Sequence, residues 1–516
     1  MFSWIWRCLR RLILRILCLF QRPPVPPTGP WSGDAVTGRW DVVLTDSNVS
    51  AIHMAVLRTN EVLWFSGGRG QVVPNATEMK NWVWRVPDIG TSAPPANQPV
   101  ETDPVNKQLF CAGHSFLRDG RLLVVGGSEP DGTGIRDVFI YDPNAKSWTP
   151  VALLGRIRWY PTTVTLPDGR VAAFSGRGDL TVHEIYQVGQ PWQNLDMDRT
   201  LPIYAGLHLL PDGKLLYTGT YWGDETGIPD ANTAILTPAN PNWTPDTTGV
   251  TSGTWQSITG PNDPQRKEGM SVLLPLAEDG RVMVVGGDGT NGATQSLNSV
   301  EVMDTTVVNP TWQTIHPMSY RRSNVNVVIL PDSKVLVSGG GTSRRGPQVL
   351  PCELFDTSVN YMNSAINPWT TVASLNARRQ YHSTCVLLPD GRVLAGGNDT
   401  GSRVMSLEAY RPPYWFRGPR PRIWYAPTRT HIGSTFTIDS PDAPHVDRAV
   451  LVRPMADTHH TDSEQRLLNL PIMRRGRCSL RVRAPANHRL APPGYYMLFL
   501  VNTSGVPSVA DFIEIH

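Results

Sequence analysis

The chain has 516 residues, which is too many for one compact hydrophobic core, so we expect at least two folded units. Its 47 Lys and Arg residues nearly balance its 44 Asp and Glu residues, which excludes the strongly basic character of a nucleic-acid-binding protein. Six cysteines do not make a disulfide scaffold, and the sequence leaves open whether Cys352 and Cys385 form a bridge.

The N-terminal segment, residues 1–22, is basic and amphipathic. Arg7, Arg11 and Arg15 recur every four residues among Trp, Leu, Ile and Phe, so a helix here would carry a basic stripe beside a broad apolar face. Its runs without arginine are too short to span a bilayer, and Arg15 interrupts the apolar core that a secretory signal needs. Residues 23–39 follow as a proline-rich spacer.

Two interpretations of this N-terminal segment stay open. It is either an interfacial or signal-anchor helix that contacts a membrane surface, or a misassigned start or disordered tail. The first interpretation places the protein outside the cell or at the cell surface.

One pattern recurs seven times between residues 51 and 397: an apolar strand, a tight turn usually of the Asp-Gly type, a second apolar strand and a glycine. Asp-Gly takes the positive φ angles that a two-residue hairpin turn needs. The closing glycines are Gly67, Gly126, Gly176, Gly219, Gly286, Gly339 and Gly396. Further short apolar strands often follow, so each copy predicts a four-stranded blade. Residues 40–417 are therefore predicted to form a seven-bladed kelch-type β-propeller, which makes the chain all-β.

Residues 418–516 follow a rigid, proline-rich connector and alternate apolar and polar residues in short strands. About a hundred residues of this kind predict an immunoglobulin-like β-sandwich. The long polar loop 458–466 is unusual for a sandwich because it contains His459 and His460. We expect it to reach into the propeller channel.

Distinctive residues precede three of the seven hairpins. They are Cys111, Tyr160 and the neighbours Tyr381 and His382. Each stands at a similar offset from its apolar strand, so we expect them to face one axis at the mouth of the channel, where propellers carry their chemistry. Each residue alone is better explained by packing, but together with one of the loop histidines they make two phenols and two imidazoles. Such a nitrogen and oxygen ligand set favours copper(II), whereas zinc more often binds His with carboxylate or thiolate.

With these motifs the sequence resembles the copper-radical oxidases, meaning galactose oxidase and, more closely, the glyoxal oxidase-like branch. The resemblance runs from about residue 40 to the C-terminus and has its most specific anchors at Phe110-Cys111, Arg158-Trp159-Tyr160, Tyr381-His382, residues 414–421, Thr458-His459 with Gln465-Arg466, residues 490–496 and residues 505–508.

The resemblance implies a role for each candidate residue. A thioether would join Cys111 to the ring of Tyr160, and this modified phenol would bind copper and hold a radical. Tyr381 would be the axial tyrosinate and general base. His382 and His459 would be the imidazole ligands, because the family's histidine lies six residues before the Gln of Gln-Arg, which selects His459 over His460.

The implied reaction is the two-electron oxidation of a small aldehyde or primary alcohol, with dioxygen reduced to hydrogen peroxide. One copper ion would accept one of the two electrons, in passing from Cu(II) to Cu(I), and the Cys111–Tyr160 cofactor would accept the other. Two alternatives stay open: a non-catalytic kelch propeller that binds glycan or protein at the cell surface, and a membrane-tethered oxidase that acts on surface polysaccharide. We expect a monomer with no nucleic-acid partner.

One departure from the family concerns the cover of the thioether. In galactose oxidase a tryptophan lies over it, but the corresponding loop here reads Gly176-Arg177-Gly178-Asp179. This argues against galactose as the substrate. Trp159 and Trp222 are the candidates to replace that tryptophan, although either can equally be a packing residue.

Overall fold

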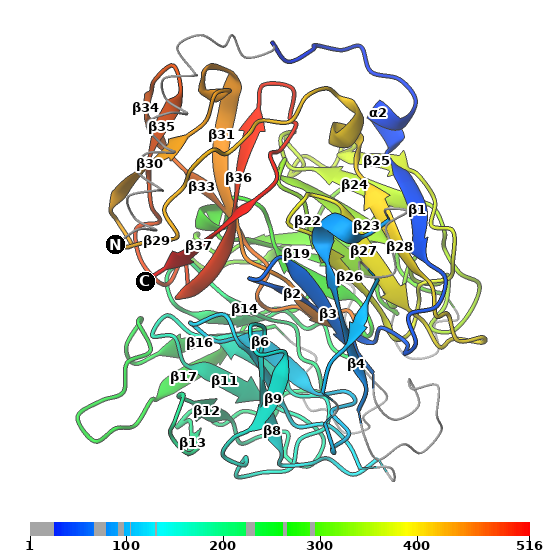
Figure 1. Ribbon diagram of the computed structural model, residues 1–516. Helices are drawn as coiled ribbons and strands as arrows, with labels where there is room; N and C mark the ends of the chain where they lie inside the picture. Colours follow the sequence, from blue (N-terminus) through cyan, green and yellow to red (C-terminus); the bar gives the residue numbers. More distant parts are fainter. Residues whose placement is uncertain are drawn as a thin grey trace.

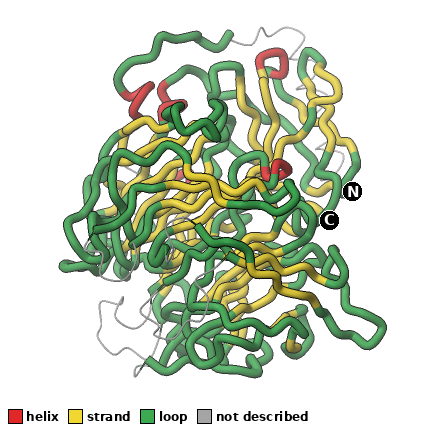
Figure 2. The backbone as a smooth tube through the Cα atoms, turned by 180° about the vertical axis from the view of Figure 1, so that it is seen from behind, coloured by secondary structure: helices red, strands yellow, loops and turns green. Residues whose placement is uncertain are grey.

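The computed structural model describes residues 25–66, 79–90, 98–103, 105–129, 132–222, 233–261, 266–288 and 295–516. Strands dominate these residues and helices are few and short (Figures 1 and 2), so the predicted all-β class is confirmed. The helical elements are α2 (Asp34–Thr37) and the 3-10 turns η2 (Val86–Asp88), η4 (Ala277–Asp279), η5 (Pro413–Phe416) and η6 (Ala443–His445). None of the helices in the described ranges is long and apolar enough to cross a membrane. The predicted N-terminal segment 1–22 lies outside the described residues.

Seven sheets form the propeller, as predicted, and six of them have four strands while the first gains a fifth from the C-terminal unit. The strands nearest the channel are β2 (His53–Leu57), β6 (Gly113–Phe116), β10 (Thr162–Thr165), β14 (Leu207–Leu209), β18 (Met270–Leu273), β22 (Asn326–Ile329) and β26 (Ser383–Leu387). Their hairpin partners are β3 (Glu61–Phe65), β7 (Leu122–Val125), β11 (Val171–Phe174), β15 (Leu215–Tyr217), β19 (Arg281–Val285), β23 (Lys334–Ser338) and β27 (Val393–Gly397). All seven channel strands are buried on both faces. This explains why their sequences are continuous apolar runs and do not alternate apolar with polar residues.

The two outer strands complete each blade. The third strands are β4 (Asn81–Arg85), β8 (Val138–Asp142), β12 (Glu184–Tyr186), β16 (Ala234–Pro238), β20 (Val300–Asp304), β24 (Cys352–Asp356) and β28 (Leu407–Arg411). The outermost are β5 (Val100–Glu101), β9 (Ser147–Pro150), β13 (Gln193–Asn194), β17 (Gly253–Ser257), β21 (Trp312–Thr314), β25 (Trp369–Val372) and, in the last blade, β1 (Arg39–Leu44). Because β1 precedes the first blade and pairs with β28 of the last, it closes the ring. The segment limits at residues 22, 39 and 417 stay predictions.

The C-terminal strands form two sheets that pack face to face, which confirms the predicted β-sandwich (Figure 1). One sheet contains β29 (Arg429–Thr430), β37 (Asp511–Ile515), β36 (Gly494–Asn502), β31 (Val446–Val452) and β33 (Leu467–Leu470). The other contains β30 (Thr435–Asp439), β35 (Ser479–Arg483) and β34 (Ile472–Arg475). Apolar residues of both sheets share one core.

The sandwich covers the propeller face that carries the hairpin turns. The turn at Gly169 takes φ 86°, as an Asp-Gly turn requires, and its neighbour across the interface is Pro493 of the sandwich. Arg448 donates to the Ser333 hydroxyl of another turn, at 2.7 Å. The opposite ends of the channel strands, where the candidate residues stand, therefore open on the far side of the propeller.

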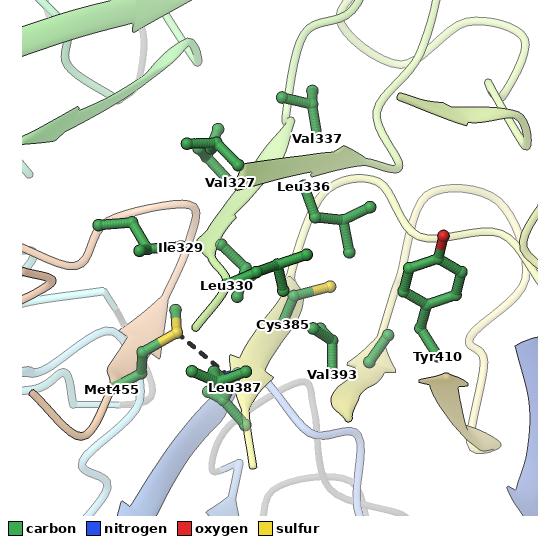
Figure 3. Close-up of a cluster of buried hydrophobic side chains, with 14 of the residues drawn as sticks. Val327, Ile329, Leu330, Leu336, Val337, Cys385, Leu387, Val393, Tyr410 and Met455 are labelled. Atoms are coloured by element: carbon green, nitrogen blue, oxygen red, sulfur yellow. Dashed lines mark hydrogen bonds between the residues drawn. The ribbon is translucent and has the colours of Figure 1, made fainter. Parts of the chain in front are cut away.

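One segment of the sandwich enters the channel. Strand β32 (Ala456–Thr458) pairs with β2 and becomes a fifth strand of the first blade. Just before it, the Met455 sulfur accepts a hydrogen bond from the Leu387 backbone N–H of the last blade at 3.3 Å (Figure 3). The predicted insertion of the loop 458–466 is thus fixed by backbone pairing on one side and by core packing on the other.

A buried Arg–Glu pair recurs in four blades. The pairs are Arg158–Glu184, Arg266–Glu301, Arg322–Glu353 and Arg379–Glu408, with N···O distances of 2.6, 2.6, 3.0 and 3.0 Å and side chains at most 1% exposed. Each guanidinium also donates to a backbone carbonyl at the end of the second strand, as Arg379 does to Gly397 at 3.0 Å. The pair thereby ties the loop before the channel strand to the second and third strands of its blade.

Cys352 and Cys385 are both free thiols, so the bridge that the sequence left open does not form. Cys385 lies in the packed core of the last blades, among side chains that include Leu336, Leu387 and Val393 (Figure 3).

Loss of one member of a buried pair should be costly. Glu353→Gln leaves the Arg322 guanidinium buried without its counter-charge, and we expect the free energy of unfolding to fall by about 3–5 kcal/mol. The exposed pair Lys80–Glu101 is the control, since its side chains are 47% and 38% exposed and Lys80→Ala should cost no more than about 1 kcal/mol. Urea denaturation of the two variants measures both changes, and equal losses would contradict the argument.

Buried histidines should make stability fall in acid. Burial, assisted by the nearby Arg158 charge, lowers the pKa of His183 from 6.5 to about 3, so the unfolded chain takes up a proton below pH 6.5 that the folded chain refuses. Stability is therefore lost as pH falls, by about 1.4 kcal/mol per pH unit for this group. The variant His183→Gln lacks this pH-dependent contribution to the free energy of unfolding. The difference in stability between the variant and the wild type should therefore change by about 1.4 kcal/mol per pH unit between pH 6 and pH 4. A constant difference across this range would contradict the assignment.

Candidate metal centre

The candidate residues stand where the chain turns into the channel strands. Cys111 and Tyr160 lie two residues before β6 and β10, and His382 lies directly before β26. Their φ angles are 59°, 62° and 62°, and that of His459, directly after β32, is 49°. A left-handed backbone costs a residue with a side chain about 1–3 kcal/mol and is typically found at functional sites. Four of the five candidate residues share this conformation, which aims their side chains away from the blade and toward the axis.

The structure brings all five candidates together in a buried cluster. The Cys111 sulfur lies 3.2 Å from His459 Nε2, and the His382 and His459 rings have centroids 4.4 Å apart. The Tyr160 ring lies 5.3 Å from the His459 ring, and the Tyr381 ring lies 3.7 Å from the His382 ring. One ligand atom each of Cys111, His382 and His459 lie within 4.8 Å of one another, so a metal ion can reach all three segments.

The two imidazoles are oriented by hydrogen bonds on their outer nitrogens. His382 Nδ1 lies 2.6 Å from the Asp399 carboxylate, and His459 Nδ1 lies 2.7 Å from the Thr458 hydroxyl. Such partners fix the ring and its tautomer, which leaves Nε2 as the nitrogen for a metal. His460 instead turns its Nδ1 toward Asn326, at 3.4 Å, and not toward Cys111.

Burial keeps the cluster neutral. Desolvation raises the pKa of the Tyr160 phenol and of the Cys111 thiol well above their ordinary values, and the Tyr160 backbone N–H donates to the Cys111 carbonyl at 2.9 Å. Burial also raises the pKa of Tyr381, and it lowers the pKa of His459, which the neighbouring His382 lowers further. A bound divalent cation would reverse the balance for the phenols by stabilising their anions.

Two tryptophans cover the Tyr160 ring. Trp222 stacks on it with centroids 4.5 Å apart and an interplanar angle of 26°, and Trp159 stacks at 4.6 Å and 29°. Trp222 also stacks on Tyr381, at 5.4 Å and 15°. On the solvent side the guanidinium of the exposed Arg345 lies 4.0 Å from the centre of the Tyr381 ring.

Sequence reasoning missed three residues around this cluster. His53 accepts a hydrogen bond from the Cys111 backbone N–H at 3.1 Å, Asp399 orients His382, and Tyr204 donates to the Ala112 carbonyl at 2.9 Å. His53 and Tyr204 stand at the start of the first and fourth channel strands, so the same search at every blade mouth reaches both. Asp399 follows the glycine pair that closes the seventh hairpin, so it lies after its hairpin, whereas the other proposed site residues of the propeller precede theirs.

Two family models match the chain, which is also similar to known oxidases. The model of the glyoxal oxidase N-terminus matches residues 95–414, and that of the galactose oxidase-like early set domain matches residues 420–515. The galactose oxidase of Gibberella zeae is 27% identical over 79% of this chain, and the chain spans only 61% of that protein's length. The aldehyde oxidase GLOX of Vitis pseudoreticulata is 26% identical, over 93% of this chain and 97% of that protein.

A solved structure has the same fold. It is a fungal alcohol oxidase of the AA5 family in complex with copper, with a TM-score of 0.77 over 93% of this chain and 99% of that chain, at 22% identity. The match of the glyoxal oxidase model covers more than half of the sequence and includes the channel strands of six of the seven blades. The chain therefore belongs to the glyoxal oxidase family, with a galactose oxidase-like early set domain at its C-terminal end.

Proposed function

We propose that the protein is a copper-radical oxidase that oxidises a small aldehyde or primary alcohol and reduces dioxygen to hydrogen peroxide. The observation that carries the proposal is the buried cluster of Cys111, Tyr160, Tyr381, His382 and His459, in which the Tyr160 backbone N–H donates to the Cys111 carbonyl at 2.9 Å and the Cys111 sulfur lies 3.2 Å from His459 Nε2. The named relatives, a galactose oxidase and an aldehyde oxidase, support the reaction class.

The donor set fits a copper ion. Two imidazoles and two phenols are the nitrogen and oxygen donors that copper(II) prefers in a tetragonal site. Tyr160, Tyr381, His382 and His459 would hold the ion, which when bound would accept one electron in passing from Cu(II) to Cu(I). Burial of all four side chains, at most 8% exposed, keeps bulk water from competing for the ligand positions.

The chain's own residues would supply the rest of the chemistry. Removing two electrons from a substrate needs a second acceptor, and a Tyr160 phenol joined by a thioether to Cys111 is an oxidisable side chain that delocalises a radical. Tyr381, the most exposed of the four ligands at 8%, would take the proton of the substrate hydroxyl as general base. Substrate loses two electrons and two protons, and dioxygen gains both as hydrogen peroxide, so the reaction balances.

The same proposal places the protein outside the cell or at its surface. The basic amphipathic sequence 1–22 is suited to a membrane interface, and a monomer suffices because one chain contributes the whole cluster. Small aldehydes and alcohols, and the end groups of a surface polysaccharide, have the chemistry that this cluster would oxidise.

The thioether can be tested by mass. Purified protein loaded with copper in air should lose two hydrogens, and peptide mapping should assign the loss to Cys111 and Tyr160. Cys111→Ala should abolish both the mass change and peroxide release. Cys385→Ala is the matched control, because Cys385 is also a buried free thiol but lies away from the cluster, and it should leave both unchanged. Copper binding without the mass change would point to a simpler copper site, and the absence of both to a non-catalytic binding propeller.

The two adjacent histidines should differ in their effect on copper. Both are buried, but only His459 directs Nε2 to the Cys111 sulfur, at 3.2 Å. We expect His459→Ala to lose most of its bound copper, while His460→Ala keeps a stoichiometric ion. Metal analysis after dialysis, together with the copper EPR spectrum, measures this. Loss of copper from His460→Ala alone would reverse the assignment.

The cover of Tyr160 should affect the lifetime of its radical. Trp222 contacts both phenols, whereas Trp159 contacts only one of them, so Trp222→Phe should shorten the lifetime more than Trp159→Phe does. An aromatic stacking contact contributes about 0.5–1.5 kcal/mol, which corresponds to a change of about twofold to tenfold. Decay of the radical's visible absorption in the two variants tests this, and a larger effect of Trp159→Phe would contradict it.

A further inference from the structure

The outer face of the three-stranded sandwich sheet is rich in exposed arginine. In β35 the residues Leu480 and Val482 point into the core, and Arg481 and Arg483 point outward. The register places Arg474 of β34 directly opposite Arg481, so both occupy the same outer face. We call Arg474, Arg481 and Arg483 the arginine face, and all three are exposed. Figure 1 shows β30, β34 and β35 at the edge of the molecule, on the side away from the propeller blades.

This arrangement works against folding. Like charges directly opposite on neighbouring strands are destabilising. None of the three arginines forms an ion pair within the described part of the chain, and the sheet's own carboxylate, Asp439, is buried. Among the residues that the structure describes, Arg481 donates only to the Thr435 hydroxyl, at 2.9 and 3.2 Å. The inward side chains already fill the core, so the arginines are not needed for packing.

Composition indicates that the charge is specific to this unit. Residues 418–516 contain twelve arginines and no lysine against eight acidic residues, although the whole chain is nearly balanced. Arginine forms bidentate hydrogen bonds with phosphate and carboxylate, which lysine cannot do. An anionic partner on this face would remove the repulsion between Arg474 and Arg481.

The N-terminal end of the described chain lies beside the same sheet. Pro26 lines one small cavity together with Pro419, Arg420 and Asp442. Two residues before Asp442, the Ser440 backbone N–H donates to the Cys478 carbonyl in the turn between β34 and β35, at 3.0 Å. The described chain thus begins close to the sheet that carries the arginine face. The sequence of residues 1–24, which precede it, contains five arginines, no acidic residue and a high content of Trp, Leu, Ile and Phe.

We infer that the arginine face docks on the surface of an anionic lipid bilayer. Each arginine near such a surface strengthens binding about fivefold, and stable attachment usually requires two weak signals that act together. An acidic polysaccharide would satisfy the charges as well. It offers no apolar layer for the tryptophans and leucines of residues 1–24, however, so the sequence favours a bilayer.

Docking in this way would set the orientation of the enzyme. The sandwich covers the hairpin-turn face of the propeller, as shown by Arg448 at Ser333 and by Asn469 at Glu278. The candidate metal centre opens at the other end of the channel strands. A sandwich held on the membrane would therefore turn the mouth of the site toward the aqueous phase.

The test is sedimentation of the full-length protein with phosphatidylcholine vesicles, with and without phosphatidylserine as a third of the lipid. The triple variant Arg474→Gln, Arg481→Gln, Arg483→Gln should bind the anionic vesicles about 100-fold more weakly than the wild type. The matched control is Arg39→Gln, Arg85→Gln, Arg156→Gln, which removes the same charge from propeller arginines that are 49%, 64% and 50% exposed. Its binding should stay within about threefold of the wild type, because loss of net charge alone has a small effect beyond a Debye length.

Two results would overturn the inference. One is equal vesicle binding by both triple variants. The other is a wild-type protein that does not bind anionic vesicles but is retained on immobilised polygalacturonate, which would identify a glycan as the partner instead. Peroxide release from a soluble substrate should be the same in all three proteins. This readout separates a failure of docking from a failure of the proposed oxidase activity.

Discussion

The ion pair between a buried arginine and a buried glutamate fixes the loops that present two of the proposed ligand segments, those of Tyr160 and of Tyr381 and His382. Arg158 and Arg379 each bind a glutamate on the third strand of their blade and a carbonyl at the end of its second strand. Both arginines are within three residues of a left-handed residue, Tyr160 or His382. Burying such a pair gains little net stability, because desolvation offsets most of the attraction. Its effect is conformational, since it holds the loop so firmly that a strained backbone persists and presents a side chain to the axis.

The same buried Arg–Glu pair beside a left-handed residue is present in two blades that supply none of the proposed ligands. Arg266 precedes Glu268 and Arg322 precedes Asn324, and both of these residues also have positive φ angles, near 55°. The glutamate and the asparagine hydrogen-bond to each other at 2.7 Å. The scaffold thus offers similar positions around the channel, and the residue types at those positions decide which ones carry chemistry. His459 reaches the centre by a different route, through a strand of the sandwich that joins the first blade. The proposed centre therefore depends on both folded units, and separating them would remove one imidazole.

Much of this architecture could be predicted from the sequence because its signals are local. Each hairpin can be predicted from about fifteen consecutive residues, because they contain its turn and its two apolar runs, and seven such repeats indicate a propeller. The proposed ligands were found because they precede those hairpins at a similar offset. The closing strand β1 was not predicted, since its partner β28 lies more than 360 residues away, as the contact of Asp41 with Arg411 shows. The pairing of the buried arginines with their glutamates was not predicted for the same reason, because 26 to 35 residues separate the two partners in the sequence. Trp222 could be named as a cover for Tyr160, but only three-dimensional packing distinguishes it from an ordinary core residue.

The most direct test of the proposed centre is a crystal structure of the copper-loaded protein with data collected at the copper absorption edge. We expect one strong anomalous peak within bonding distance of Tyr160, Tyr381, His382 and His459, and continuous density between the Cys111 sulfur and the Tyr160 ring. A copper peak elsewhere would contradict the proposed centre, as would the absence of electron density joining that sulfur to that ring in protein matured in air.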